Sequence, residues 1–448
     1  GKWRSGGASR WWLHHSLAAM AADLARLGSR LVIRRGDSLE VIGTLARQCQ
    51  AQALYFHRGY EPFQAALEAR LWQELGEKLE IRRFRGRLLQ EPEQIRTGAG
   101  EPFRVFTPFW KAYLRLSEPG ALLPTPARLA PPPPEVAGLD LESLQLRPQA
   151  PDWAVGPGAH WRPGEAGAQS RLETFCEEVL RDYAEGRDLP ARPGTSRLSP
   201  HLHFGEISPR QVWQAVRGVQ AISAATTRGG DAFLRELVWR DFSHHLLHHW
   251  PGLPEQPFNP RFADFPWRDD EVGFRAWTRG QTGFPLVDAG MRELWHTGWM
   301  HNRVRMVTAS FLVKHLLVPW QRGQNWFWDT LVDADLANNA GGWQWVAGCG
   351  ADAAPYFRIF NPVLQGQRFD PRGAYIRRWL PELRGLSDQA IFAPFAAKPA
   401  DLAAAGVRLG VDYPEPLVLQ DAARRRALAA LATLKGAGGP GMDPGSTP

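Results

Sequence analysis

The sequence has few cysteines, few lysines and no long apolar run. Its three cysteines, Cys49, Cys176 and Cys349, form no C-x-x-C pair, which excludes a disulfide framework and argues against a cysteine zinc site. No uncharged apolar run approaches the roughly 18 residues that a bilayer span needs, and no secretory leader pattern opens the chain. We therefore expect a protein of the bacterial cytosol that is not embedded in a membrane.

Lysine is scarce, with 6 residues against 47 arginines, although the 448-residue chain carries a net charge of +7. Arginine binds phosphate through two parallel hydrogen bonds, so this bias permits a nucleic-acid partner. A genome rich in G and C would produce the same bias, and the composition alone leaves the partner open. The 20 tryptophans against 7 tyrosines are more unusual, because aromatic bulk alone does not require indole.

The first 90 residues alternate between helical and extended patterns. The spacing predicts helices over residues 11–28, 38–49 and 61–76 and strands over residues 30–36, 53–57 and 79–84. Strict alternation is typical of a parallel α/β sheet. No G-x-G-x-x-G and no G-x-x-x-x-G-K-[ST] motif is present, so the pattern predicts an architecture and leaves the ligand open.

A proline-rich connection follows, and beyond it the pattern is helical. We predict an α/β domain over residues 1–90, a connector over 91–165, an all-helical domain over 166–435 and a disordered tail over 436–448. Hydrophobic residues make up 44% of the chain, which is enough to bury a core in each domain and excludes global disorder. The predicted fold class is therefore α/β plus all-α.

Two segments combine residue types that suit nucleotides. Residues 194–199 place hydroxyls and an arginine before a predicted helix, which suits a phosphate, whereas the ordinary interpretation is a helix cap with its turn. Glu236, Trp239, Arg240 and Ser243 recur at i, i+3, i+4 and i+7, so they share one helix face. That face suits stacking on an unpaired base, but an exposed face with an ion pair has the same pattern.

Three more segments carry unusual residues. The four histidines within 244–249 have the i, i+4 spacing of metal ligands but lack the glutamate of H-E-x-x-H, so we expect no functional metal. Residues 302–306 gather an asparagine and two arginines, which a core helix would not normally contain. Residues 333–345 gather two aspartates, glycines and two tryptophans, a combination that lets backbone approach a polar ring system closely.

Six motifs resemble those of one known family: TSRLSP, ELVWRDF, TGWMHNRVRM, LVDADLANNAGGWQW, DAAPYFRIFNP and FDPRGAYIRRWLPEL. With Tyr183 they span residues 183–383, and they resemble the photolyase and cryptochrome family, most closely its class I cyclobutane pyrimidine dimer photolyases. The resemblance implies a Rossmann-like antenna domain, a connector, and a helical domain that encloses FAD. It also implies that this chain begins after the first strand of the antenna domain, and that the antenna chromophore is methenyltetrahydrofolate or 8-hydroxy-5-deazaflavin.

The resemblance assigns functional residues by position. FAD contacts fall on Tyr183, Thr195, Ser196, Arg197, Leu198, Ser199, Phe233, Arg305, Asp333, Ala334, Asp335 and Asn339. DNA and lesion contacts fall on Arg187, Glu236, Trp239, Arg240, Asn302, Arg303, Met306, Trp345 and Gln365. An electron-transfer chain falls on Trp343 nearest the flavin, then Trp320, then Trp267 at the surface. Asn339 lies beside the flavin N5, where an amide cannot donate a proton as a carboxylic acid could, which favours an anionic flavin.

The implied function is light-driven repair by a deoxyribodipyrimidine photolyase, a carbon–carbon lyase that acts as a monomer on DNA containing pyrimidine dimers. Light-excited reduced FAD donates an electron to a flipped dimer, whose radical anion Glu236 stabilises, while Trp239 and Trp345 stack in the pocket. The main alternative is a cryptochrome, a blue-light photoreceptor without repair activity, which Asn339 disfavours. Asn302 disfavours a (6-4) photolyase, which would have a histidine pair there.

Overall fold

The computed structural model describes residues 3–116, 120–353 and 357–436. The chain divides into two compact units. Unit 1 comprises residues 1–254, 293–300 and 325–341, and unit 2 comprises residues 255–292, 301–324 and 342–448. The tail predicted to be disordered, apart from Gly436, lies outside the described residues, as do residues 354–356 of the DAAPYFRIFNP motif.

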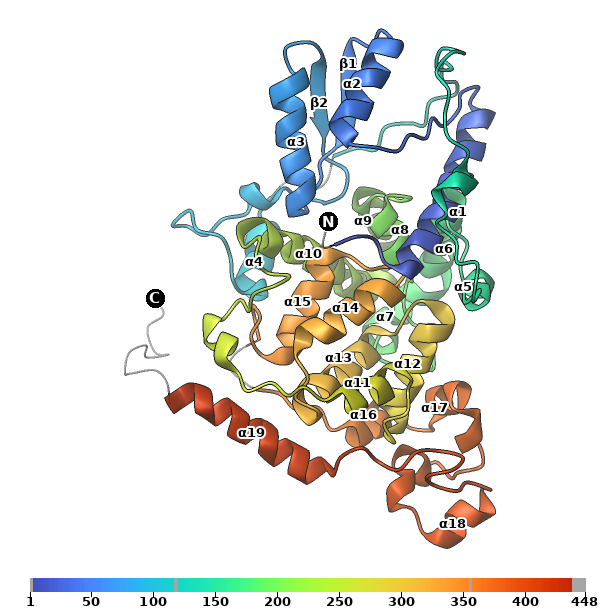
Figure 1. Ribbon diagram of the computed structural model, residues 1–448, viewed down its shortest axis with the longest axis vertical. Coiled ribbons are helices and arrows are strands. Elements are labelled where there is room, and N and C mark those ends of the chain that lie inside the picture. The colour runs from blue at the N-terminus through green and yellow to red at the C-terminus, as the bar shows by residue number, and fades with distance from the viewer. Residues whose placement is uncertain (1–2, 117–119, 354–356, 437–448) are drawn as a thin grey trace. The chain divides into compact units, whose positions relative to one another are not determined.

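The N-terminal part of unit 1 contains a small parallel sheet (Figure 1). The elements are α1 (Gly7–Arg26), α2 (Ser38–Gln48), β1 (Ala53–His57), α3 (Pro62–Leu75) and β2 (Glu80–Phe84). β1 and β2 pair in parallel, from Ala53 opposite Glu80 to His57 opposite Phe84. Gly28 follows α1 with a φ of +84°, a conformation that favours glycine. Three predicted helices and two predicted strands are thus confirmed.

The third predicted strand, over residues 30–36, is wrong. These residues pair with no strand in the described part of the chain. Instead, the Ile33 carbonyl accepts a hydrogen bond from Leu139 N–H (2.8 Å), and the Arg30 guanidinium donates to the Val136 carbonyl (2.7 Å). The adjacent connector contains four consecutive prolines, which lack the N–H groups of a ladder, so the segment is extended without forming sheet.

The connector contains a helix that periodicity did not predict. α4 (Phe106–Tyr113) is short and buries Phe106, Phe109 and Tyr113. α5 (Val155–His160) is the other α-helix in this region. Eight residues give too few turns for a recognisable repeat, so α4 is stabilised by packing rather than by its own propensity.

The rest of the described chain is helical, as predicted. It contains α6 (Glu165–Thr174), α7 (Tyr183–Gly186), α8 (Ser199–Phe204), α9 (Pro209–Ile222), α10 (Thr227–His249), α11 (Glu271–Thr278), α12 (Pro285–Thr297), α13 (Asn302–Ser310), α14 (Trp320–Thr330), α15 (Leu336–Ala347), α16 (Pro362–Phe369), α17 (Ala374–Trp379), α18 (Pro399–Ala404) and α19 (Gln420–Gly436). After β2, the described residues contain no further strand, only isolated bridges. No helix in this part combines the length and the apolar run that a bilayer span requires.

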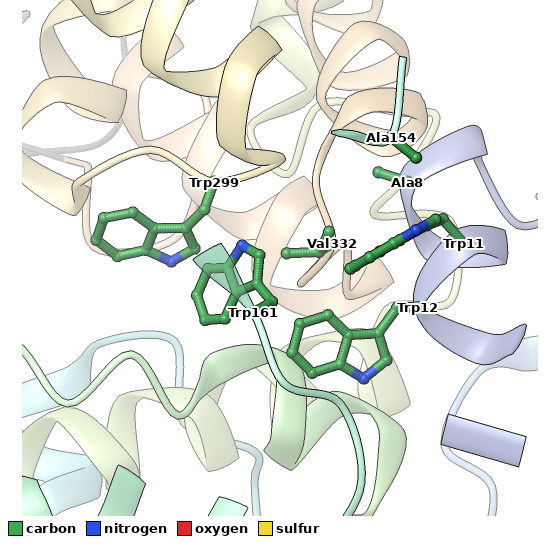
Figure 2. Close-up of a cluster of buried hydrophobic side chains, with 7 residues drawn as sticks. All are labelled: Ala8, Trp11, Trp12, Ala154, Trp161, Trp299 and Val332. Carbon is green, nitrogen blue, oxygen red and sulfur yellow. The ribbon is translucent and has the colours of Figure 1, made fainter. Parts of the chain in front are cut away.

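Part of the tryptophan excess is structural. Figure 2 shows a buried cluster in unit 1 composed of Ala8, Trp11, Trp12, Ala154, Trp161, Trp299 and Val332. The Trp12 indole donates to the buried Glu206 carboxylate (3.0 Å), and the Trp161 indole donates to the Thr297 carbonyl (2.7 Å). Indole combines a large apolar body with one N–H donor, and both properties are satisfied here.

Candidate functional site

The predicted FAD contacts of unit 1 meet where α8 faces the loop before α15. The Ser199 hydroxyl donates to the Asp333 carboxylate at 2.6 Å. One helical turn further along α8, His203 Nδ1 lies 3.7 Å from Asp335 Oδ2. Ala334, between the two aspartates, is buried. Ser199 and His203 therefore hold the carboxylates of Asp333 and Asp335 against one face of α8.

Asp335 is the most strongly perturbed acid of this group. Its Oδ1 accepts from Asn338 N–H (2.9 Å) and from the Asn338 side-chain amide (2.7 Å), which places it at the start of α15. Its Oδ2 faces His203 and, at 3.3 Å, His244 Nε2. Burial alone would raise the pKa of Asp335, but the two histidines hold it well below its ordinary value. Asp335 is therefore a buried anion.

His244 is hydrogen-bonded in a way that fits a cation. Its Nδ1 lies 3.0 Å from the Arg240 carbonyl, while its Nε2 faces Asp335. Both partners are acceptors, and only the imidazolium can donate from both ring nitrogens. His244 therefore links α10 to the Asp335 carboxylate.

The pKa of a second carboxylate, that of Glu61, is shifted by the same group of residues. Glu61, at the start of α3, is buried, and its pKa is raised, first by burial and then by the negative charge of Asp335. His203, Arg87 and His244 act in the opposite direction on this group. Among these, the Arg87 guanidinium donates to the His203 carbonyl at 3.0 Å. The N-terminal α/β elements therefore contribute an acid to the surroundings of Asp335.

Other predicted FAD contacts of unit 1 are two buried aromatic side chains and a polar loop. Tyr183 and Phe233 are buried, with ring centroids 5.3 Å apart and planes at 89°. Burial raises the pKa of Tyr183. Thr195 and Ser196 are half-buried, and Leu198 is fully buried.

Arg197 has an unusual backbone for a residue other than glycine. Its φ is +53°, in the left-handed region. Its guanidinium lies over the Trp299 ring, 4.8 Å from the centroid, so a cation–π contact accompanies this conformation. A positive φ also occurs at other residues that are not glycine: Gln50, Gln145, Leu317 and Asp352. This conformation therefore does not by itself mark residues 195–199 as a site.

α10 presents the predicted lesion-contact face as a half-buried stripe. Glu236, Trp239, Arg240 and Ser243 are all intermediate in exposure, whereas most neighbouring positions are buried. Glu236 accepts from Arg187 at 2.5 Å, and this ion pair raises the pKa of Arg187 although burial opposes it. Arg240 donates to the Arg87 carbonyl. The face is therefore neither plain solvent-exposed surface nor core.

Trp239 is held by a ring contact. Its indole stacks on Phe106 of α4, with centroids 3.7 Å apart and planes at 10°. Phe242 meets the indole edge-on at 5.6 Å. The single-sequence pattern identified Trp239 but not Phe106, because the contact joins positions more than a hundred residues apart.

Unit 2 contains the other DNA candidates. The Arg303 guanidinium lies 4.4 Å from the Phe369 ring centroid and approaches Met306 Sδ at 3.9 Å. Asn302 is exposed at the start of α13, and Arg305 is half-buried on the same helix. Trp345 and Gln365 are also half-buried, and the Arg358 guanidinium lies 5.6 Å from the Trp345 ring. These side chains retain partial exposure, as contacts to a ligand require.

Of the three tryptophans assigned to electron transfer, the last in the predicted order is the one with partial exposure. Trp343 and Trp320 are buried, and Trp267 is half-buried. A Cβ added to Gly323 would lie 2.1 Å from the Trp343 ring, so Trp343 packs against the first turn of α14, which begins at Trp320. Trp343 also meets Trp277 edge-on at 6.1 Å. Asn339 is half-buried on α15 in unit 1, and its N–H donates to the Asp335 carbonyl.

The histidines within 244–249 contact different residues of the chain, except that His245 and His249 both face the Pro92 carbonyl. His245 accepts from Phe103 N–H (3.1 Å), His248 faces Glu93 (3.3 Å), and His249 lies 3.5 Å from the Pro92 carbonyl. No group of three or more metal-ligating side chains occurs in residues 3–116, 120–353 and 357–436. His203 and His244 are the site residues that sequence reasoning missed, although the HLHF that follows TSRLSP was a possible signal.

Two protein-family models and several known proteins match this chain. Residues 233–433 match the FAD binding domain of DNA photolyase, and residues 1–133 match DNA photolyase. A deoxyribodipyrimidine photo-lyase of Agrobacterium fabrum is 50% identical over 431 residues, covering 96% of this chain and 90% of that protein. Cryptochrome-2 of Arabidopsis thaliana is 40% identical over 436 residues, covering 95% of this chain and 71% of that protein. The structure of a class III photolyase from Agrobacterium tumefaciens has a TM-score of 0.94 and 50% identity, covering 96% of this chain and 89% of that one.

These similarities correct one prediction and confirm another. Class I is not supported, because the solved structure with 50% identity is that of a class III photolyase. The motifs behind that prediction are ones to which the resemblance assigns cofactor and DNA contacts, and residues with tasks shared across a family do not distinguish its classes. The two-part architecture, an N-terminal photolyase domain and a C-terminal FAD-binding domain, is confirmed. The chain belongs to the photolyase and cryptochrome family.

Proposed function

We propose that this protein is a photolyase that repairs cyclobutane pyrimidine dimers in DNA with light. The observation that carries the proposal is the layout of α10. His244 binds Asp335 in the cofactor group, and Trp239 lies five residues earlier in the half-buried stripe. Five residues correspond to about 7.5 Å along a helix, so one rigid element brings the cofactor group within a short distance of an aromatic surface for a flipped base.

The donor set fits FAD. The hydroxyls and backbone N–H groups of residues 195–199 suit its phosphates, and the carboxylates of Asp333 and Asp335 suit hydroxyl and ring N–H groups. Tyr183 and Phe233 provide apolar contact. The resemblance also assigns an FAD contact to Arg305 on α13. When bound and reduced, FAD supplies the light-excited electron that splits the dimer.

The chain's own residues would then recognise the lesion. Trp239 stacks on the flipped bases, and Glu236 exchanges its ion pair with Arg187 for a hydrogen bond to the dimer. The resemblance assigns a stacking role to Trp345 as well. Arg187 is thereby released toward a phosphate. Arg240, Asn302, Arg303, Met306 and Gln365 complete the proposed DNA surface. We place the protein in the cytosol as a monomer.

The alternative is a cryptochrome-type photoreceptor without repair activity, which the 40% identity to Cryptochrome-2 keeps in view. Asn339 favours repair, because its amide does not supply the proton of a carboxylic acid at that position. In either case Trp343, Trp320 and Trp267 would carry electrons during photoreduction. Photoreduction therefore does not separate the two alternatives. Repair of DNA does, so the proposal is tested by a repair assay.

The experiment is a repair assay. The reduced, FAD-loaded protein is illuminated with an oligonucleotide that contains one thymine dimer, and dimer loss is measured by chromatography. We expect light-dependent loss in the parent and a large reduction in Glu236→Ala, with FAD content unchanged. A protein that binds FAD and photoreduces but leaves the dimer intact would be a cryptochrome-type photoreceptor.

A cavity in unit 1 is our candidate for the antenna chromophore. It has a volume of about 480 Å³ and is lined by Trp11, His15, Arg147, Pro148, Asp152, Ala154, Val155, Gly158, Trp161, Arg162 and Pro163. Indole walls suit a flat ring, and the two arginines suit an anionic substituent, which both a folate and a deazaflavin can carry. Trp11→Ala should remove the near-ultraviolet antenna absorbance of the purified protein while FAD remains bound.

A further inference from the structure

Phe106 covers one face of the Trp239 indole. The two rings are nearly parallel, 10° apart in plane, and their centroids are 3.7 Å apart. Phe106 is fully buried, whereas Trp239 is half-buried. A side chain without exposure cannot contact DNA itself, so any effect of Phe106 on DNA binding must pass through the residues that it touches.

Phe106 is itself held by its surroundings. Phe242 meets its ring at 5.7 Å, Phe109 lies at 6.5 Å, and the Arg235 guanidinium lies 5.4 Å from its centroid. Phe242 also contacts the Trp239 indole edge-on. The indole is thus fixed on one face and one edge before any ligand arrives. A binding group that is already ordered loses less conformational freedom when its ligand binds.

We propose that Phe106 is a positioning residue for lesion recognition: it holds the Trp239 indole in the orientation that stacks on a flipped pyrimidine dimer. The inference rests on the proposed function. It assigns part of the discrimination between damaged and undamaged DNA to α4 of the connector, outside the FAD-binding domain match that begins at residue 233. Since undamaged duplex presents no flipped base, Phe106 affects only the damaged complex.

The test compares two phenylalanines on the same helix. Phe106 and Phe109 are both fully buried on α4, but the ring partners of Phe109 include Phe103, Tyr113, Phe242 and His245 and not Trp239. Phe106→Leu and Phe109→Leu remove the same atoms, so Phe109→Leu controls for a lost ring in the core. Dissociation constants are measured in the dark for a dimer-containing duplex and for the identical undamaged duplex.

We expect Phe106→Leu to weaken binding to damaged DNA by about three- to tenfold, the range of an aromatic pair contact, with no change for undamaged DNA. Phe109→Leu should leave the ratio of the two constants as in the parent. If Phe106→Leu leaves the ratio unchanged, or if Phe109→Leu lowers it equally, the proposal is overturned. Circular dichroism melts check folding, and Phe106→Met replaces Phe106→Leu if the latter does not fold.

A double-mutant cycle separates positioning from general packing. In the Trp239→Ala background, Phe106→Leu should have no further effect on the ratio, because the side chain through which it acts is gone. Equal effects in both backgrounds would overturn the proposal while leaving the proposed function intact. A parent protein that does not prefer damaged DNA would overturn both, which distinguishes the two failures.

Discussion

Two adjacent rows of α10 each combine a charged residue with a histidine, and the two histidines have different partners. Arg240 and His244 form one row, and Asp241 and His245 form the other. His244 places both ring nitrogens against acceptors, the Arg240 carbonyl and the Asp335 carboxylate. His245 accepts from Phe103 N–H with Nε2 and faces the Pro92 carbonyl with Nδ1. The first histidine faces two acceptors, and the second faces one donor and one acceptor.

Two aspartates show a similar contrast: Asp335, which contacts His244 of the first row, and Asp241 of the second row. Asp335 faces two histidines, and its pKa lies well below the ordinary value. Asp241 accepts from the N–H groups of Leu89 and Gln90, with Arg240 4.0 Å away, and burial raises its pKa to about 6. Both carboxylates are buried. The partners, rather than the burial, therefore decide whether the pKa of a buried acid falls or rises.

Removing the Asp335 carboxylate should have the largest effect on the stability of the protein. Asp335→Ala leaves His244 buried without its counter-charge, and we expect the free energy of unfolding to fall by about 3–5 kcal/mol. Urea unfolding at pH 7 measures the loss. Asp335→Asn retains acceptors for the Asn338 groups and should lose less. Equal losses in the two variants would show that the charge of Asp335 is unimportant.

Removing the cation should be the next largest change. His244→Gln keeps one donor toward Asp335 but no charge, and a hydrogen bond to a charged group is worth about 1.5–3 kcal/mol. Because the pKa of Asp335 is lowered in the folded state, its stabilisation is present above about pH 4 and is lost as pH falls below that value. The deficit of the variant should therefore be full at pH 7 and shrink toward pH 3. A deficit independent of pH would contradict the ion pair.

Asp241→Asn should act with the opposite sign. Since the folded-state pKa of Asp241 is raised to about 6, its contribution to stability is present below about pH 4 and is lost as pH rises through 6. We expect Asp241→Asn to be about 1–2 kcal/mol more stable than the parent at pH 7, with no gain at pH 4. Urea midpoints at the two pH values test this. Equal differences at both pH values would mean that Asp241 does not titrate between them.

His245→Gln should have the smallest effect at pH 7, about 1 kcal/mol, because it removes one hydrogen bond between neutral groups. Burial lowers the pKa of His245 to about 4, so its contribution is present above about pH 6.5 and is lost as pH falls through 4. In the parent this slope opposes that of Asp241, and only the variant-minus-parent difference shows it. A larger loss at pH 7 than in His244→Gln would reverse the comparison of the two rows.

Much of the fold could be predicted from the sequence, because the elements around the small sheet have clear local patterns. Residues 30–36 fail because their short apolar run predicts a strand, but a strand also requires a partner with free N–H groups. α4 was missed because it is short and is stabilised by distant aromatic residues. Local sequence patterns thus predict a helix or strand only where the residues of that element themselves show helical or extended spacing.

The candidate site divides in the same way. Ser199, Asp333 and Asp335 were predicted through motifs, and the structure brings them together in unit 1. His203 and His244 were not, since their role depends on contacts between α8, α10 and the loop before α15. The tryptophan count was also ambiguous: Trp12 and Trp161 are core residues, and no composition separates them from Trp239.

The length and continuity of α10 restrict how this protein can change. Its 23 residues carry Phe233, the lesion stripe and the two rows of charged residues on one unbroken rod. Each residue turns an α-helix by about 100°. Inserting or deleting a single residue after Val238 would therefore rotate Arg240, Asp241, His244 and His245 together away from their partners outside the helix. Point substitutions can tune these sites separately, but a change of length in α10 would disable them at once.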